Sequence, residues 1–341
     1  MSSIQADSAA FSAQDWASAL ALYRRPSFTR AGFEIAVTLL PFVAVWIAML
    51  VAIHSGHIWL SFAMTPVAAG LLVRLFMIQH DCGHGAFTPS KAVNDWIGRA
   101  IGVLTMTPYD LWRRSHAIHH ATSGNLDRRG VGDIDTLTVK EYFGRSWRAR
   151  LAYRLYRHPL VMFGLGPIYV FLIQNRLPVG FMRKGAMPWW STMATNAAFL
   201  GVAALIAWGA GLGPLLLIHL PMVAVSATIG VWLFYVQHQF EETNWEHAGH
   251  WSHAEAALHG SSLYELPQPL SWFSANIGIH HVHHLSSGIP YYRLREVLHD
   301  HPALQNISRL GLIESLACVR LTLWDEDKRK LVSFREARAA R

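Results

Sequence analysis

Charged residues are scarce in this chain of 341 residues. Asp, Glu, Lys and Arg together make up 15% of the sequence, whereas apolar types make up 52%. An ordinary soluble domain carries about 25% charged residues. This deficit disfavours a large soluble core and predicts a protein that lies in a membrane.

Cysteine is also scarce, because Cys82 and Cys318 are the only two and stand far apart. No CxxC motif and no disulfide framework is available, which fits a reducing compartment. Zinc ribbons and iron–sulfur clusters are excluded, since both need clustered thiolates. Residues 1–31 are polar or amphipathic ahead of a long apolar run, which is not the layout of a signal peptide.

The formal charge of +7 comes from 29 Lys and Arg against 22 Asp and Glu. A basic excess is typical of proteins that bind nucleic acid or an anionic membrane surface. Because long apolar runs accompany it here, we expect a bilayer as the partner and no nucleic acid.

Four apolar runs reach the length of about 20 residues that a helix needs to cross the hydrocarbon layer. They are residues 33–53, 58–79, 189–210 and 214–237. Neither HSGH nor GAGLGP, which join the runs pairwise, contains Lys or Arg, whereas residues 110–187 hold 13 and the stretch from 293 to the end holds 10. The positive-inside rule therefore places both termini and the long middle segment in the cytoplasm.

Two further apolar stretches, 97–108 and 160–173, are shorter and contain Arg99 or Gly and Pro. Runs of this length more often lie in the membrane interface or re-enter it than cross it. We expect both to lie at the cytoplasmic interface. The predicted fold is an all-α integral membrane protein with four transmembrane helices and a cytosolic helical cap.

Histidine is abundant, with 20 residues, and three tight clusters stand at or beyond the cytoplasmic ends of predicted spans. They read HDCGH, HAIHH and HHVHH, and their members are His80 and His84; His116, His119 and His120; and His280, His281, His283 and His284. On a helix, residues three and four apart share one face. Each cluster therefore aims two or three imidazoles in one direction.

The HxxxH pattern and the two HxxHH patterns, which leave out His281, supply eight imidazole nitrogens. One tetrahedral metal ion needs only four ligands. Imidazole binds Zn, Cu, Fe and Ni. Two irons, each with four or five nitrogens and open positions for oxygen, fit this count, and two zincs remain an alternative. The series His247, His250, His253 and His259 drifts around a helix, so we do not expect a metal there. Isolated histidines such as His54 are expected at the surface or hydrogen-bonded in the core.

The three clusters resemble the histidine boxes HxxxH, HxxHH and HxxHH of membrane fatty-acid desaturases, in the same order. The surrounding sequences HATSGNLDRRGVGDIDTLTVKEY, FYVQHQFEETNW and NIGIHHVHHLSSGIPYY resemble those of bacterial acyl-lipid desaturases. The resemblance runs from about residue 30 to 300. It implies a cytosolic segment 1–32, a membrane desaturase domain 33–300 and a cytosolic tail 301–341.

The resemblance also implies the chemistry: two iron ions, O2 as co-substrate, and a cis double bond introduced into a membrane acyl chain. The expected substrate is an acyl-lipid, with acyl-CoA left open. Electrons would come from a separate protein such as ferredoxin, flavodoxin or cytochrome b5, because the chain contains no segment like them. The expected location is a bacterial inner membrane, with the active site on the cytoplasmic side.

The family pattern adds one histidine ligand after the fourth span, and His238 is the matching residue. Relatives can place an Asn four residues before it, where this chain has Phe234. Ligating imidazoles need partners on the second ring nitrogen. Candidates near the boxes are Asp81, Asp133, Asp135, Glu241, Glu242, Asn276 and the surplus His281.

Two other functions compete with this interpretation. A di-iron hydroxylase of alkanes, carotenoids or lipids would have similar boxes, but HDCGH and SSGIPYY favour a desaturase. A membrane metal transporter would place ionisable ligands inside its spans. Here the span interiors contain almost none, and Arg74 lies near a cytoplasmic end from which it could reach the interface.

Overall fold

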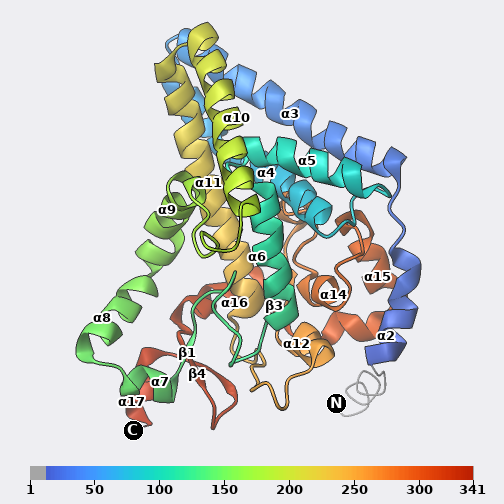
Figure 1. The fold of residues 1–341 in the computed structure, drawn as a ribbon, viewed down its shortest axis with the longest axis vertical. Helices are drawn as coiled ribbons and strands as arrows, with labels where there is room; N and C mark the ends of the chain where they lie inside the picture. The colour runs from blue at the N-terminus through green and yellow to red at the C-terminus, as the bar shows by residue number, and fades with distance from the viewer. Residues whose placement is uncertain (1–12, 341) are drawn as a thin grey trace.

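The computed structural model describes residues 13–340, so residues 1–12 of the predicted N-terminal segment lie outside the described part. Four long apolar helices dominate it (Figure 1): α3 (Phe28–His54), α4 (Ile58–Gly83), α10 (Met187–Ala210) and α11 (Leu212–His238). Each contains one of the predicted runs, so the prediction of four helices of membrane-spanning length is confirmed. α3 and α4, like α10 and α11, form a hairpin whose turn lies at one end of the molecule.

Local sequence explains where these helices begin and turn. The Ser27 side chain accepts a hydrogen bond from the Arg30 amide and caps α3. Gly211 joins α10 to α11 with a φ of 93°, a left-handed conformation that glycine adopts without a steric penalty.

The four helices differ in how far they are surrounded by protein. In α4, 67% of the most apolar window is buried, compared with 6% in α10. α4 packs between α3 and α11 and against α5 (Lys91–Leu104), whereas α10 stands at the outside of the bundle. The first histidine box therefore lies at the end of the most enclosed helix.

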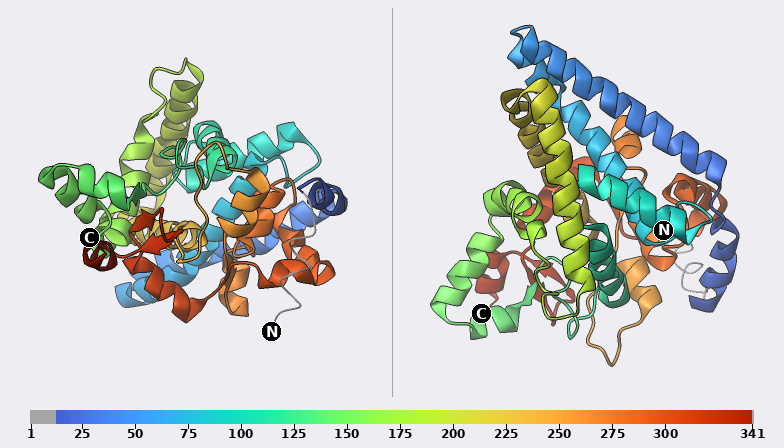
Figure 2. Two further views of the ribbon diagram at one scale, coloured as in Figure 1. Left: turned by 90° about the horizontal axis from the view of Figure 1, so that it is seen from below. Right: turned by 45° about the horizontal axis from the view of Figure 1, so that its top comes forward.

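The two shorter apolar stretches are helical. Residues 97–104 of the first lie in α5 and 105–108 form the connection after it, and the second forms a π-helical turn (Val161–Leu165) followed by α9 (Gly166–Leu172). Together with α8 (Trp147–Tyr156) the second makes a pair bent by 57°, which projects from the side of the bundle in both views of Figure 2. By length and composition this pair could make a fifth crossing, so its interfacial position stays a prediction.

The cap below the long helices is built from short helices and two small sheets. Its helices are α6 (Tyr109–Thr122), α7 (Val139–Gly144), α12 (His253–His259), α13 (Gln268–Phe273), α14 (His280–Leu285), α15 (Leu294–Asp300), α16 (Leu312–Ser315) and α17 (Phe334–Ala339), and α2 (Ala13–Leu20) lies beside it. Strands β1 (Leu137–Thr138), β4 (Leu323–Asp325) and β5 (Lys330–Val332) form one sheet, and β2 (Leu263–Glu265) pairs with β3 (Arg309–Gly311).

The sheets tie distant parts of the chain to the cap. β1 pairs in parallel with β4 in the register Leu137↔Leu323, and β4 pairs antiparallel with β5. Residues 309–332 are thereby joined to segments that precede them by many residues. The strands were not predicted, and the division of the chain at residues 32 and 300 stays a prediction.

Candidate metal centre

All nine histidines predicted to bind metal converge at the junction between the long helices and the cap. His80 lies in the last turn of α4 and His84 follows directly after the end of that helix, α6 carries three of the nine, α11 ends in His238, and α14 carries three. They form two groups in which the nitrogens lie within 4.8 Å of one another. The groups are His80, His84, His116, His120 and His283, here called the five-imidazole group, and His119, His238, His280 and His284, the four-imidazole group.

Ring nitrogens in the five-imidazole group are too close and too many for hydrogen bonding. His116 Nε2 lies 3.0 Å from the Nε2 atoms of His80 and His84, and 3.1 Å from that of His120. A neutral imidazole nitrogen either donates one hydrogen or accepts with one lone pair. Three simultaneous contacts on one nitrogen are instead expected where several lone pairs point at a shared cation.

The four-imidazole group has the same spacing. His280 Nε2 lies 3.0 Å from His238 Nε2 and 3.1 Å from His284 Nε2. Two nitrogens each about 2.1 Å from a metal and at a right angle would be about 3.0 Å apart. His119 Nε2 is buried and has no hydrogen-bond partner, which fits a ligand atom facing the same point. The residues present therefore fit two metal ions.

Burial favours the neutral form, which is the form that binds metal, in five of these imidazoles. Loss of solvent, followed by neighbouring imidazoles, lowers the pKa of His116 and His120 well below the usual range. The same two causes act on His280, His283 and His284. In these five, burial therefore disfavours the proton that would compete with a metal for the ring nitrogen.

Three of the ligand candidates have a fixed partner on the second ring nitrogen. His119 Nδ1 lies 2.5 Å from Asp133 Oδ1, and His80 Nδ1 lies 3.2 Å from Asp81 Oδ1. His238 Nδ1 contacts the carbonyl oxygen of Gly260 at 3.1 Å. A partner on Nδ1 holds the proton there and turns Nε2 toward the metal.

Among the described residues, four of the five remaining partner candidates have no hydrogen bond or ion pair to a ring nitrogen of either group. Asp135 is exposed, and its side chain contacts no ring nitrogen in residues 13–340. Glu241 pairs with Lys330 at 2.6 Å. Asn276 Oδ1 accepts from Arg295 Nε at 2.7 Å, and His281 Nε2 contacts the Leu304 carbonyl oxygen at 2.9 Å. For these four, proximity in sequence to a box did not mean contact with its imidazoles.

Phe234 takes the place next to two of the ligand candidates. Its ring centre is 5.0 Å from that of His119 and 5.2 Å from that of His238. Where relatives can have an amide, this chain therefore presents an apolar ring to the four-imidazole group.

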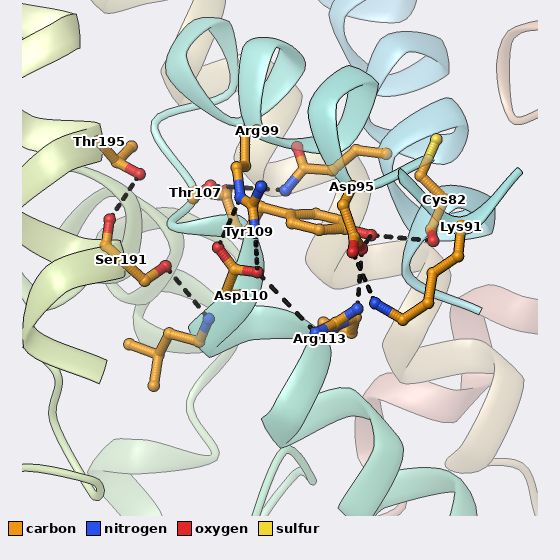
Figure 3. A network of polar contacts seen from close by, with 12 residues as sticks. Cys82, Lys91, Asp95, Arg99, Thr107, Tyr109, Asp110, Arg113, Ser191 and Thr195 are labelled. Atoms are coloured by element: carbon orange, nitrogen blue, oxygen red, sulfur yellow. Dashed lines mark hydrogen bonds and ion pairs between the residues drawn. The ribbon is translucent and has the colours of Figure 1, made fainter. Parts of the chain in front are cut away.

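A polar network outside the boxes fixes the first box and was missed from the sequence (Figure 3). Tyr109 Oη contacts the Cys82 carbonyl oxygen at 2.9 Å and Asp95 Oδ1 at 3.0 Å. Lys91 Nζ and Arg113 Nη1 donate to the same carboxylate at 2.7 and 2.8 Å. Cys82 lies between His80 and His84, so the network ties the turn of the first box to α5 and α6.

The network depends on a close approach that only glycine permits. A Cβ atom on Gly98 of α5 would lie 2.2 Å from the Tyr109 ring. Beside it, Arg99 and Asp110 form a two-point ion pair with both distances at 3.0 Å. None of these residues belongs to a metal-ligand motif. Charged residues spread over α5 and α6 form no sequence motif that would have predicted the network.

An apolar cavity of about 290 Å³ leads to the imidazoles. Its walls come from α4, α11 and α9, and include Leu72, Val73, Phe76, Met77, Phe171, Val223, Ala227, Val231, Leu233 and Phe234. It ends on His80 and His116 of the five-imidazole group and on His280 of the four-imidazole group. Trp112 lines the same end and stacks on His116 with 4.6 Å between ring centres.

Comparison with known proteins agrees with this geometry. The family model "Fatty acid desaturase" matches residues 57–309. A fatty acid desaturase of Bacillus subtilis is 46% identical over 319 residues, which cover 93% of this chain and 89% of the relative. The sn-1 acyl-lipid omega-3 desaturase (ferredoxin) of Synechocystis is 34% identical over 65% of this chain and 61% of its own length. The sn-1 oleoyl-lipid 12-desaturase of Synechocystis is 26% identical, with 73% of each chain covered.

Proposed function

The chain belongs to the fatty acid desaturase family, and from that premise we propose that it is an O2-dependent di-iron acyl-lipid desaturase. It would introduce a cis double bond into an acyl chain of a membrane lipid. The observation that carries the proposal is the apolar cavity that ends on imidazoles of both groups. A bare hydrocarbon chain in this cavity would lie against the place where two metals are expected.

The nine histidines would hold the metals, five at one ion and four at the other. When bound, two irons supply the chemistry that side chains lack: with two electrons and two protons from outside, O2 is reduced to two waters while two C–H bonds give way to a double bond. The Nδ1 partners Asp133, Asp81 and the Gly260 carbonyl oxygen hold the imidazoles in the required orientation.

The cavity walls would select and align the acyl chain. Most of their side chains are aliphatic or aromatic, and the polar ones besides the histidines are Thr105, Ser115, Ser226 and Gln237, so the cavity favours a hydrocarbon over water, which competes at a reactive centre. Phe234 stands between the cavity and the four-imidazole group. Its ring would limit how closely the chain approaches that side.

The protein is a membrane protein by family and by its four apolar helices, and we place the metal centre and both termini on the cytoplasmic side. The support is the distribution of Lys and Arg, which are absent from the two short turns between paired spans. One relative is a ferredoxin-dependent enzyme by name. A small separate electron donor, acidic enough to meet the net charge of +7, therefore fits this chain as well.

The test is expression in a host that makes no polyunsaturated lipids, followed by mass spectrometry of intact lipids and their fatty acids. A new double bond in chains still esterified to lipid is the expected result. An added oxygen atom instead would identify a hydroxylase, and unsaturation confined to acyl-CoA would move the substrate away from lipids.

Two variants tie that product to the metal centre. His84→Ala removes one candidate ligand and should abolish the product while the protein stays in the membrane. His54→Ala is the matched control, because His54 is exposed at the α3–α4 turn, where its ring hydrogen-bonds to the Leu50 carbonyl oxygen, and it belongs to neither imidazole group. Elemental analysis of the active protein should find close to two irons per chain.

A further inference from the structure

A second cavity has a volume of about 260 Å³ and is lined by Arg74 of α4. The apolar cavity proposed to hold the acyl chain, here called the acyl cavity, is lined by other residues of the same helix. The second cavity is enclosed by α3, α4, α13 and α15, and the two cavities share no lining residue. The start of α3 is joined to the turn that precedes α15, because the Ser27 amide donates to Tyr292 Oη at 3.0 Å. This pocket therefore sits at the proposed cytoplasmic end of the first span.

Three arginines and one carboxylate line this second cavity. Glu34 is buried and accepts from Arg30 Nη2 at 2.7 Å, Arg74 Nη2 at 2.5 Å and Tyr291 Oη at 3.0 Å. Arg74 is buried too, and it also donates to Thr38 Oγ1 at 3.1 Å. Arg74 thus does not extend toward the interface as we expected, because Glu34 on the neighbouring helix pairs with it.

Arg295 is the third arginine that lines this cavity, and it has no carboxylate partner. Its Nε donates to Asn276 Oδ1 at 2.7 Å and its Nη2 to Ser271 Oγ at 2.9 Å, both neutral acceptors. Among the described residues no Asp or Glu pairs with Arg295. One carboxylate faces three guanidinium groups, so the pocket has an uncompensated positive charge.

Apolar surface adjoins the charged groups. Phe33 is 54% exposed, and Trp272 is 37% exposed. The Arg30 guanidinium lies over the Phe33 ring at 5.3 Å, and that of Arg74 lies over Trp272 at 4.2 Å. A ligand that fits both parts has an anionic end for the arginines and an apolar end for the lipid-facing side of α3.

We propose that this pocket binds the phosphate of an anionic phospholipid, held by Arg30 and Arg295 at the rim above the buried Arg74–Glu34 pair. Guanidinium groups bind phosphate oxygens through strong, charge-assisted hydrogen bonds. Basic pockets on the cytoplasmic side of membrane helices are suited to such headgroups. This lipid is separate from the chain in the acyl cavity, because the two cavities have different walls.

Binding can be measured on the purified full-length protein in detergent, as the rise in melting temperature on adding a short-chain lipid. The probes are dioctanoyl-phosphatidylglycerol, dioctanoyl-phosphatidylcholine and inorganic phosphate. Phosphatidylglycerol should raise the melting temperature most, because the ammonium of phosphatidylcholine would meet the arginine rim. Arg295→Gln and Arg30→Gln should each raise the half-saturating concentration of phosphatidylglycerol roughly tenfold, as expected for loss of one charge-assisted hydrogen bond.

Arg293→Gln is the matched control. It removes the same charge two residues from Arg295, but Arg293 pairs with Glu296 and does not line the pocket. Each variant is compared with its own melting temperature without lipid, and Arg30 is half exposed, so its loss should leave the fold intact.

An equal phosphatidylglycerol response in wild type, Arg30→Gln and Arg295→Gln would overturn the site. An equal response to inorganic phosphate, lost in both variants, would keep the anion site but overturn the lipid. The readout does not involve the desaturase product, so it stands or falls apart from the proposed reaction.

Discussion

The two imidazole groups lie side by side yet differ in their surroundings. In the five-imidazole group, His84, His116 and His120 are only partly buried, whereas all four members of the other group are buried. The five-imidazole group comes from α4, α6 and α14, and the four-imidazole group uses α11 in place of α4. One group therefore faces the edge of the protein, and the other lies in its interior.

This difference separates two properties that a metal site needs. A buried group with fixed Nδ1 partners holds a metal in one geometry and resists its escape. A partly exposed group with one more ligand can exchange with its surroundings while the additional nitrogen preserves affinity. We infer that the four-imidazole group depends more on its supporting residues, and the five-imidazole group more on the number of its ligands.

The most severe test of the comparison is His280→Ala. His280 Nε2 lies 3.0 to 3.1 Å from two other members of the four-imidazole group, and the side chain also ends the acyl cavity. Its loss leaves three nitrogens, so we expect this group to lose its metal and the protein to lose all desaturated product. Metal analysis and lipid analysis of the same preparation measure both.

His281→Ala is the control next to it in sequence. His281 is equally buried but contacts the Leu304 carbonyl oxygen and belongs to neither group. Its loss should lower the free energy of unfolding by about 1–3 kcal/mol and leave the metal content unchanged. Equal metal loss in both variants would show that local unfolding, and not ligation, explains the effect.

The histidines of the three boxes, which the structure brings together, could be picked out from the sequence because box spacing is a local property. Residues three or four apart on a helix share a face whatever surrounds the helix, so the three boxes could be found without the fold. His238 was found only through the family resemblance, since a single histidine at the end of a span has no pattern. The four long helices followed from run length alone.

The supporting residues could not be found in this way, because they depend on contacts between distant segments. Asp133 and Asp135 are the same residue type and stand two positions apart, so the sequence does not distinguish them. Only the path of the loop after α6 brings Asp133, and not Asp135, to His119. β1 pairs with β4 across 186 residues, as Leu137↔Leu323, and strands of two or three residues show no alternation to detect. Tyr109 was missed for the same reason.

Asp133→Asn tests how strongly the four-imidazole group depends on a residue that holds one of its histidines in place. The amide can no longer accept a charge-assisted hydrogen bond from His119 Nδ1, so the buried four-imidazole group loses its closest partner. We expect metal affinity or activity to fall about 10–100-fold. Asp135→Asn makes the same chemical change two residues later, where no imidazole is in contact, and should match wild type in iron titration.

Removal of metal by a chelator should then occur in two phases. The partly exposed five-imidazole group should release its ion several-fold faster than the buried group, because the chelator can approach it first. Stopped samples analysed for iron and for residual activity would follow both phases. In Asp133→Asn only the slow phase should accelerate, because Asp133 supports the four-imidazole group. If only the fast phase accelerated, the four-imidazole group would be the one that releases its metal first, and the prediction would be wrong.

The smallest expected effect comes from Tyr109→Phe, which acts on the five-imidazole side alone. The Tyr109 hydroxyl contacts the Cys82 carbonyl oxygen and Asp95. When this hydroxyl is removed, Asp95 still has Lys91 and Arg113 as partners. The Cys82 oxygen also keeps the Gly85 amide, 3.0 Å away. The cost should therefore be about 1 kcal/mol of stability, with faster chelation in the fast phase only.

Tyr153→Phe provides the comparison for this last variant. The Tyr153 hydroxyl donates to the Thr322 carbonyl oxygen at 2.7 Å and accepts from the Leu137 amide at 3.1 Å, beside β1 and β4, and it belongs to neither imidazole group. Stability should fall by a similar amount because a buried hydroxyl is again removed, yet both chelation phases should stay at their wild-type rates. If Tyr109→Phe and Tyr153→Phe changed the fast phase equally, the Tyr109 network would be a general support of the fold and not a specific brace for the first histidine box.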